Sequence, residues 1–267
     1  MLHYAPRIIV LVTFFQAIIL AIVEGLTEFL PISSTGHLIL IQRYLSITSS
    51  EFSKTFDIVI QLSAILAVVW IYRKTLFSQF GIWKQSMVAF IPTGIIGFLF
   101  YKLIRNVLLE EPIIIVYSLF IGGVILLVVD KLTKINRGQG RILNLPPNKL
   151  IFIGILQSIS VIPGVSRSAT AIIGGLSTGL SRSQAVEFSF FLAIPTMFAA
   201  AGFDLLKSGM SFSAQEYSVL LVGCFFSFIS ALIAVRFFID YVQKNNFTSF
   251  AIYRIVLALV VLLTMKA

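Results

Sequence analysis

The amino-acid sequence predicts an all-α integral membrane protein that forms a single membrane domain. We expect six transmembrane helices and two re-entrant helical hairpins, arranged as two inverted-topology repeats. Three observations lead to this fold class: the composition is strongly apolar, six stretches have roughly the length of a membrane span, and two longer stretches carry matching breaks.

The composition excludes an ordinary soluble domain. Of the 267 residues, 58% are apolar and only 12% are charged, and the mean hydropathy is +1.00, whereas soluble domains carry about 25% charged residues. The net charge of +9 indicates basic loops that face the cytoplasm and anionic membrane lipid. Nucleic acid is not expected as a partner, because no basic stripe with interleaved aromatic residues is present.

The first element is a stretch between Arg7 and Arg43 whose only charges are Glu24 and Glu28. It is too long for one span of about 20 residues and too short for two, and Pro31 interrupts it. We therefore expect a half-helix, an irregular turn at membrane depth and a second half-helix, with the turn buried in protein or facing a wet cavity. An ordinary helix that ends before Pro31 and is followed by a polar loop remains the alternative.

A second stretch of this kind lies between Lys149 and Arg182, with Pro163 near its centre and Arg167 as its only charge. The same reasoning predicts a second re-entrant hairpin. Six further stretches can cross the membrane as single helices. They are Phe56 to Tyr72, Ile82 to Phe100, Ile113 to Val129, Glu187 to Leu206, Tyr217 to Phe238 and Phe250 to Met265.

Landmarks in the two halves of the chain recur at one spacing. Pro31 and Pro163 are 132 positions apart, as are Ser34 and Ser166, and Phe56 and Phe188. This spacing predicts two repeats, at approximately 1–133 and 134–267. Each repeat has one hairpin and three crossings, and an odd number of crossings inverts the second repeat relative to the first.

Basic residues gather on one side of this predicted topology. They are Arg73, Lys74 and Lys84, then Lys131, Lys134, Arg137, Arg141 and Lys149 in the central connection, then Arg236 and Lys244. The positive-inside tendency places that side in the cytoplasm. The first hairpin then enters from outside and the second from the cytoplasm, so that their tips can meet near the middle of the membrane.

Two glutamates lie just before the first break. Glu24 and Glu28 are four residues apart and share one helix face, where a pair of like charges disfavours joint ionisation. A divalent cation, Mg²⁺ or Ca²⁺, would resolve that conflict because both ions prefer carboxylate oxygens. The alternative is an interfacial pair without a role.

The segment "SSTGH" after the break is typical of a helix start. Ser33 or Ser34 can cap it, and the free amides beyond form an anion site. His37 lies one turn after Ser34, within reach for acid or base work on that hydroxyl, although a histidine at such a place is often only a structural hydrogen-bonding group.

The second break, "IPGVSRSAT", carries Arg167 after the candidate cap Ser166. The planar guanidinium suits a phosphate; alternatively Arg167 pairs with Glu24 or Glu28 as a structural contact. Together the two breaks indicate phosphoryl transfer at membrane depth, on a phosphate attached to a long hydrocarbon chain.

At these residues the sequence resembles a known family. "EGLTEFLPISSTGH" resembles the signature of the undecaprenyl-diphosphate phosphatases, the bacitracin-resistance proteins, and "PGVSRS" resembles their second signature. "FDIVIQLSAILAV" and "EFSFFLAIP" are similar to further segments of that family. The resemblance implies hydrolysis of a polyprenyl diphosphate lipid to the monophosphate and inorganic phosphate, dependence on a divalent cation, and a location in the bacterial cytoplasmic membrane. The distribution of basic residues favours a site open to the extracytoplasmic side. A homodimer is left open.

The resemblance also implies roles for individual residues. Glu28, Ser34, His37 and Arg167 are the expected catalytic residues, and Glu24 and Glu28 the expected cation ligands. Around the two breaks, we also expect Ser33, Thr35, Gly164, Ser166 and Ser168 to bind the substrate, since helix starts offer an anion site. Two positions depart from the family pattern: Ala171 stands where threonine is usual, with Thr170 one position earlier, and Ser63 stands where glycine usually follows the Gln-Leu pair.

Two other functions share parts of this pattern. The type-2 phosphatidic acid phosphatases also use a Ser-Gly-His and a Ser-Arg motif, but their mechanism needs a histidine after the Ser-Arg, and this chain has only His3 and His37. A polyprenyl-phosphate transporter or flippase would share the inverted repeats but does not require a histidine and a hydroxyl beside an arginine. Whether Ser34 or a water molecule attacks phosphorus stays open.

Overall fold

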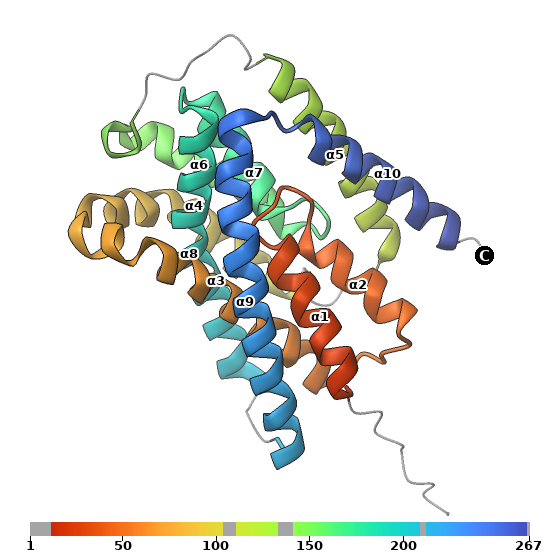
Figure 1. Cartoon of the computed structure of the whole chain (residues 1–267). Helices are drawn as coiled ribbons and strands as arrows, with labels where there is room; N and C mark the ends of the chain where they lie inside the picture. The colour runs from red at the N-terminus through yellow and green to blue at the C-terminus, as the bar shows by residue number, and fades with distance from the viewer. Residues whose placement is uncertain (1–11, 104–110, 133–140, 209–211, 266–267) are drawn as a thin grey trace, which may run out of the picture.

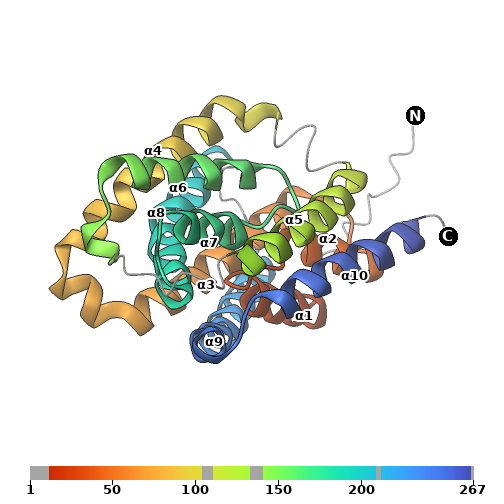
Figure 2. The ribbon, with the colours of Figure 1, turned by 90° about the horizontal axis from the view of Figure 1, so that it is seen from above.

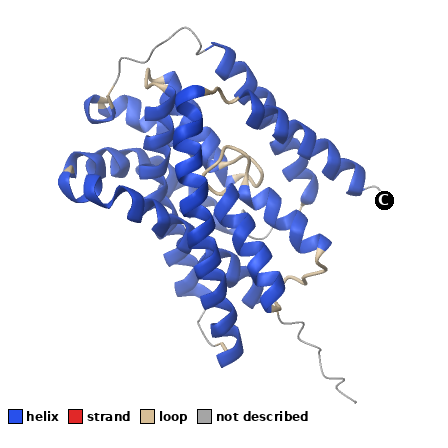
Figure 3. Cartoon of the chain, viewed as in Figure 1, coloured by secondary structure: helices blue, strands red, loops and turns tan. Residues whose placement is uncertain are grey.

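The computed structural model describes residues 12–103, 111–132, 141–208 and 212–265, and these are helical with no strand (Figure 3). His3, Lys134 and Arg137 lie outside the described residues. The helices are α1 Phe14–Thr27, α2 Ser34–Tyr44, α3 Glu51–Ser78, α4 Phe80–Leu103, α5 Pro112–Leu132, α6 Pro147–Ser158, α7 Arg167–Ser177, α8 Arg182–Ser208, α9 Ala214–Lys244 and α10 Thr248–Met265, with short 3-10 turns at Ile142–Asn144 and Ile159–Val161 (Figure 1).

Five helices of the described chain are long and apolar enough to cross a membrane: α3, α4, α5, α8 and α9. The protein is therefore a multi-pass membrane protein, as the composition predicted. The sixth predicted span, Phe250 to Met265, falls in α10, which is apolar but shorter. Several helices begin before the apolar run that predicted them; α3 begins at Glu51 because Ser50 and Ser53 cap it reciprocally.

Close helix contacts form at glycines. α1 packs along α9, and α6 packs along α4. A Cβ atom added to Gly25 of α1 would lie 2.1 Å from the Ser230 hydroxyl oxygen, and one added to Gly154 of α6 would lie 2.0 Å from the Ala89 carbonyl oxygen. Such small residues let helix backbones approach closely in membrane proteins. On one flank α5 and α10 run side by side (Figures 1 and 2).

Both predicted helix breaks are present. The chain is irregular between α1 and α2 and again between α6 and α7, beside Pro31 and Pro163. The second helix of each pair is capped by a serine with a positive φ, Ser33 at 71° and Ser166 at 73°. This backbone region is sparsely populated by residues other than glycine, and such strain persists only where the surrounding contacts hold it.

The caps identify the equivalent positions of the two breaks. The Ser33 hydroxyl accepts a hydrogen bond from the Gly36 amide, and the Ser166 hydroxyl accepts one from the Ala169 amide. Of the two predicted caps for α2, Ser33 is therefore the one used. As helix caps, Ser166 and Ser33 are therefore equivalent, whereas the sequence spacing paired Ser166 with Ser34. The second turn has one residue more than the first between its proline and its cap.

Candidate active site

The two irregular turns lie in contact with each other. The Ser168 hydroxyl of α7 donates a hydrogen bond to the Phe29 carbonyl oxygen at 2.7 Å, and the Arg167 guanidinium lies 5.8 Å from the centre of the Phe29 ring. The structure thus brings together the two sequence segments in which the chemistry was expected, although they are far apart in the chain.

Glu28 lies at the centre of this contact. Its carboxylate accepts a hydrogen bond from the Ser34 hydroxyl on one oxygen, and its other oxygen is 3.4 Å from a terminal nitrogen of Arg167. The Glu28 side chain is buried. A serine hydroxyl that already donates to a carboxylate has a general base in place for nucleophilic attack.

Arg167 keeps part of its donor capacity unused. One terminal nitrogen donates to the Ser189 carbonyl oxygen of α8 at 3.0 Å, and the other contacts Glu28. Its Nε is buried and has no hydrogen-bond partner among the described residues. Buried donors are normally satisfied, so this N–H is available to the oxygens of an anionic ligand.

Glu24 is buried one helical turn before Glu28, with 1% of its surface exposed. Its Oε1 has no hydrogen-bond partner in the described part of the chain. A buried carboxylate oxygen without a partner is costly unless a donor or a cation meets it. Glu24 and Glu28 therefore fit the protein side of a Mg²⁺ or Ca²⁺ site, whose remaining ligands would be substrate phosphate and water. No group of three or more acidic, histidine or cysteine ligands occurs among the described residues.

His37 is near the site, but its ring contacts other groups. Its Nδ1 is 2.7 Å from the Ser33 carbonyl oxygen and its Nε2 is 2.7 Å from the Tyr253 hydroxyl. Because a carbonyl can only accept, Nδ1 donates, and in the neutral ring Nε2 accepts the tyrosine proton. In this arrangement the base that contacts the Ser34 hydroxyl is Glu28 and not His37.

The predicted substrate-binding residues take different positions. Thr35 is half-buried in the first turn of α2, and Ser33 and Ser166 are the buried caps. The Ser168 hydroxyl joins the two turns. Gly164 has a φ of +89°, and its carbonyl oxygen accepts a hydrogen bond from Arg254 of α10.

Thr170 does not substitute for the threonine expected at position 171. Its hydroxyl donates within its own helix, to the carbonyl oxygens of Ser166 and Arg167. Ala171 is fully buried in the hydrophobic core. The hydroxyl of Thr170 therefore stabilises the first turn of α7.

Arg254 of α10 is the residue that sequence reasoning missed. It is fully buried, and its guanidinium donates to Pro31 O at 3.2 Å in the first turn and to Gly164 O and Val165 O at 3.0 Å in the second. It also donates to two carbonyl oxygens of α5, those of Ser118 and Leu119. One side chain therefore satisfies carbonyls that the irregular backbone leaves without helical partners.

A signal for Arg254 exists in the sequence. It is the single charged residue between Lys244 and Lys266, inside the last predicted span, and ionisable residues within a span usually have a structural or functional partner. What the sequence does not reveal is that this partner is backbone from two distant turns.

We expect Arg254→Lys to lower both thermal stability and the rate of phosphate release, the latter by about tenfold or more. Lysine has three donors and a single nitrogen, so it cannot serve carbonyls of both turns and of α5 together, and each lost bond to a charged donor costs about 1.5–3 kcal/mol. Thermal unfolding in detergent and a phosphate assay measure the two effects. Arg43→Lys, at an exposed site on α2, is the matched control, and equal behaviour of the two variants would contradict the assignment.

Comparison with known proteins gives a consistent result. The family described as "Bacitracin resistance protein BacA" matches residues 17–260. The undecaprenyl-diphosphatase of Aquifex aeolicus is 52% identical over 248 residues, which cover 93% of this chain and 97% of that protein. Undecaprenyl-diphosphatases of Persephonella marina and Thermus thermophilus are 47% and 44% identical, each over 93% of this chain and 97% and 96% of their own.

Proposed function

This chain belongs to the bacitracin resistance protein BacA family, as its motifs predicted, and from that membership we propose that it hydrolyses undecaprenyl diphosphate. The products are undecaprenyl phosphate and inorganic phosphate, which returns the lipid carrier to cell-wall synthesis and accounts for resistance to bacitracin. The observation that carries the chemistry is the buried Glu28 carboxylate, held between the Ser34 hydroxyl and the Arg167 guanidinium.

In the proposed mechanism Ser34 Oγ attacks the terminal phosphorus while Glu28 accepts the hydroxyl proton. The bond between that phosphorus and the bridging oxygen breaks, and undecaprenyl phosphate leaves. Water then hydrolyses the phosphoserine, releasing inorganic phosphate and regenerating Ser34. Arg167 holds the phosphate oxygens, because its free Nε and its terminal nitrogen on Glu28 can both turn to an anion.

A direct attack by water remains the alternative to Ser34, with Glu28 as its base. His37 was expected to transfer the proton, and its contacts with Ser33 and Tyr253 favour a role in positioning the first turn.

Glu24 and Glu28 would hold the divalent cation. When bound, Mg²⁺ or Ca²⁺ supplies charge neutralisation on the diphosphate. The Glu24 carboxylate oxygen that has no hydrogen-bond partner among the described residues supports this assignment, and Glu28 would contribute to the cation in addition to its contacts with Ser34 and Arg167.

We further propose the full architecture of six crossings and two re-entrant hairpins in two inverted repeats. In these repeats α1 corresponds to α6, and α4 corresponds to α9. The contact between α1 and α9 should therefore recur as a contact between α6 and α4, and both contacts are present. The matching serine caps of α2 and α7 support the same symmetry. The positive-inside tendency places the basic ends of the spans in the cytoplasm, so that the first hairpin enters from the opposite side. This supports a site open to the extracytoplasmic side of the bacterial cytoplasmic membrane. A homodimer stays a prediction.

A phosphate-release assay on the purified protein with undecaprenyl diphosphate tests the function. We expect release to fall at least about 100-fold with excess chelator, as the loss of charge stabilisation on a phosphate predicts, and to return when Mg²⁺ or Ca²⁺ is added. Glu24→Gln should need a higher cation concentration for half-maximal rate. If wild-type protein with cation releases no phosphate, the proposal fails and the alternative, a polyprenyl-phosphate transporter or flippase with the same repeat symmetry, takes its place.

A further inference from the structure

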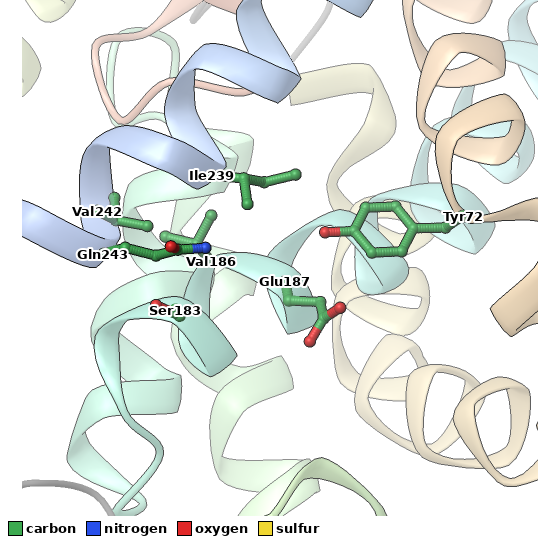
Figure 4. Close-up of a pocket in the computed structure, with 7 residues that line it drawn as sticks. All are labelled: Tyr72, Ser183, Val186, Glu187, Ile239, Val242 and Gln243. Atoms are coloured by element: carbon green, nitrogen blue, oxygen red, sulfur yellow. The ribbon is translucent and has the colours of Figure 1, made fainter.

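A cavity of about 130 Å³ lies where the C-terminal ends of α3 and α9 meet the start of α8. Its walls are formed by Tyr72, Ser183, Val186, Glu187, Ile239, Val242 and Gln243 (Figure 4). The volume is well above what a single water molecule requires. In the close-up Glu187 lies between Tyr72 on one side and Gln243 on the other.

Glu187 is a carboxylate that forms no ion pair with any basic residue in the described part of the chain. It is half-buried, and among the described residues no hydrogen bond or ion pair involves it. The same holds for the side-chain oxygens of Tyr72, Ser183 and Gln243, which line the same space. Val186, Ile239 and Val242 supply apolar walls. The cavity therefore presents several free hydrogen-bond acceptors, one of them anionic, in a partly apolar setting.

The surroundings make this carboxylate unusual, because the ends of α3 and α9 are basic. Arg73, Lys74 and Lys244 are exposed there, each within a residue or two of a wall residue. None is paired with Glu187; the Arg73 guanidinium lies over the Trp70 ring at 4.6 Å and donates to the Trp70 carbonyl oxygen. Long side chains with positive charge are available, yet the carboxylate is left facing the cavity.

The chemistry of the walls restricts the ligand. A single carboxylate is too few for a divalent cation held by protein alone. A quaternary ammonium group prefers an aromatic cage, and Tyr72 is the one aromatic residue among the wall residues. A primary ammonium has three N–H donors, which match a carboxylate, a hydroxyl and an amide oxygen.

We propose that this cavity binds a primary ammonium group, and that its source is the headgroup of an aminophospholipid. The three elements that form it are candidate membrane spans, so their ends lie at headgroup depth. Lys74 and Lys244, exposed near the same ends of α3 and α9, add positive charge that attracts lipid phosphate to this side of the protein.

The ligand does not touch the reacting groups. Phe190 lies between, with ring centres 6.4 Å from Tyr72 and 5.6 Å from Phe29 beside Arg167. Phe190 is fully buried. Removing the charge of Glu187 should therefore leave phosphate release within about twofold of wild type, as a substitution with no contact to the site allows.

The test is lipid selectivity. The full-length protein is incorporated in nanodiscs of equal phosphatidylethanolamine and phosphatidylcholine, and retained lipid is identified by native mass spectrometry. We expect wild type to retain the ethanolamine lipid about fivefold over the choline lipid, the size of one part-exposed charged contact, and Glu187→Gln to lose this preference. Asp240→Asn removes one negative charge at an exposed site on the same end of α9 and should behave as wild type.

A second arm separates the two sources of the amine. Free ethanolamine is titrated against wild type and Glu187→Gln in detergent without aminophospholipid, with choline as the comparison. Binding of ethanolamine that depends on Glu187, without selectivity between the lipids, would keep the ammonium site but assign it to a soluble amine. The proposal is overturned if Glu187→Gln keeps the lipid preference. It is also overturned if wild type prefers neither phosphatidylethanolamine over phosphatidylcholine nor ethanolamine over choline. Phosphate release is measured for each variant to show that the variant is folded. This measurement also distinguishes a failure of amine binding from a failure of the proposed hydrolysis.

Discussion

Replacing Ser34 with alanine lowers kcat for phosphate release at least about 1,000-fold, if its hydroxyl is the nucleophile. The Ser34 hydroxyl donates to the buried Glu28 carboxylate, so the variant loses the attacking oxygen and also leaves that carboxylate oxygen without its donor. KM should change little, because Arg167 and the amides at the start of α2 still hold the phosphate. Phosphate release from undecaprenyl diphosphate under single-turnover conditions measures the effect.

Ser189→Ala is the matched control for this variant. Ser189 is also a buried serine, and its hydroxyl donates within its own helix to Val186 O, while the carbonyl oxygen that accepts from Arg167 is kept. A rate for Ser34→Ala close to that of Ser189→Ala would remove the covalent route and leave water as the nucleophile. Trapping a phosphorylated Ser34 in wild type would support the covalent route directly.

Replacing Arg167 with alanine is the second large effect, with an expected loss of about 100- to 1,000-fold in kcat/KM. Arg167 is the cation that the second turn brings to the reacting groups, and its removal also leaves Glu28 without its ion-pair partner. Arg167→Lys should recover only part of the rate, because an ammonium lacks the planar fork that contacts Ser189 and Glu28 together. Phosphate release across a range of substrate concentrations separates kcat from KM.

Arg182→Ala provides the comparison for Arg167→Ala. Arg182 forms an ion pair with the buried Asp130 at 2.8 Å, between α8 and α5, so its loss is costly for stability without removing a group from the site. We expect lower thermal stability and a nearly unchanged kcat per folded molecule. Full activity in Arg167→Ala would contradict the idea that both turns build one site.

The sequence predicted the parts of this site that depend on charge and chain breaks. Glu24, Glu28 and Arg167 stand out because charges are costly in otherwise neutral apolar stretches, and Pro31 and Pro163 favour a break in the helix because proline lacks the amide donor. The spans were predicted for the same reason, and their ends were missed where polar caps such as Ser50 extend a helix beyond its apolar run.

What the sequence could not predict depends on contacts between distant segments. The choice of Ser33 over Ser34 as the cap depends on a positive φ that either serine could have adopted. The contact of His37 with Tyr253 joins residues 216 positions apart, and no local pattern reports it. Arg254 gave a visible signal, but its partners are backbone carbonyls, which every residue has, so only the folded chain identifies them.

The bonds of Arg254 also impose an order on biogenesis. The carbonyl oxygens of Pro31, Gly164 and Val165 belong to segments synthesised early and midway through the described chain, whereas the guanidinium that satisfies them arrives with α10. Until α10 inserts, the carbonyls of both turns lack this donor, which favours looser, hydrated conformations. The nascent protein should therefore acquire its catalytic geometry late, in one step, when its final described helix locks both turns at once.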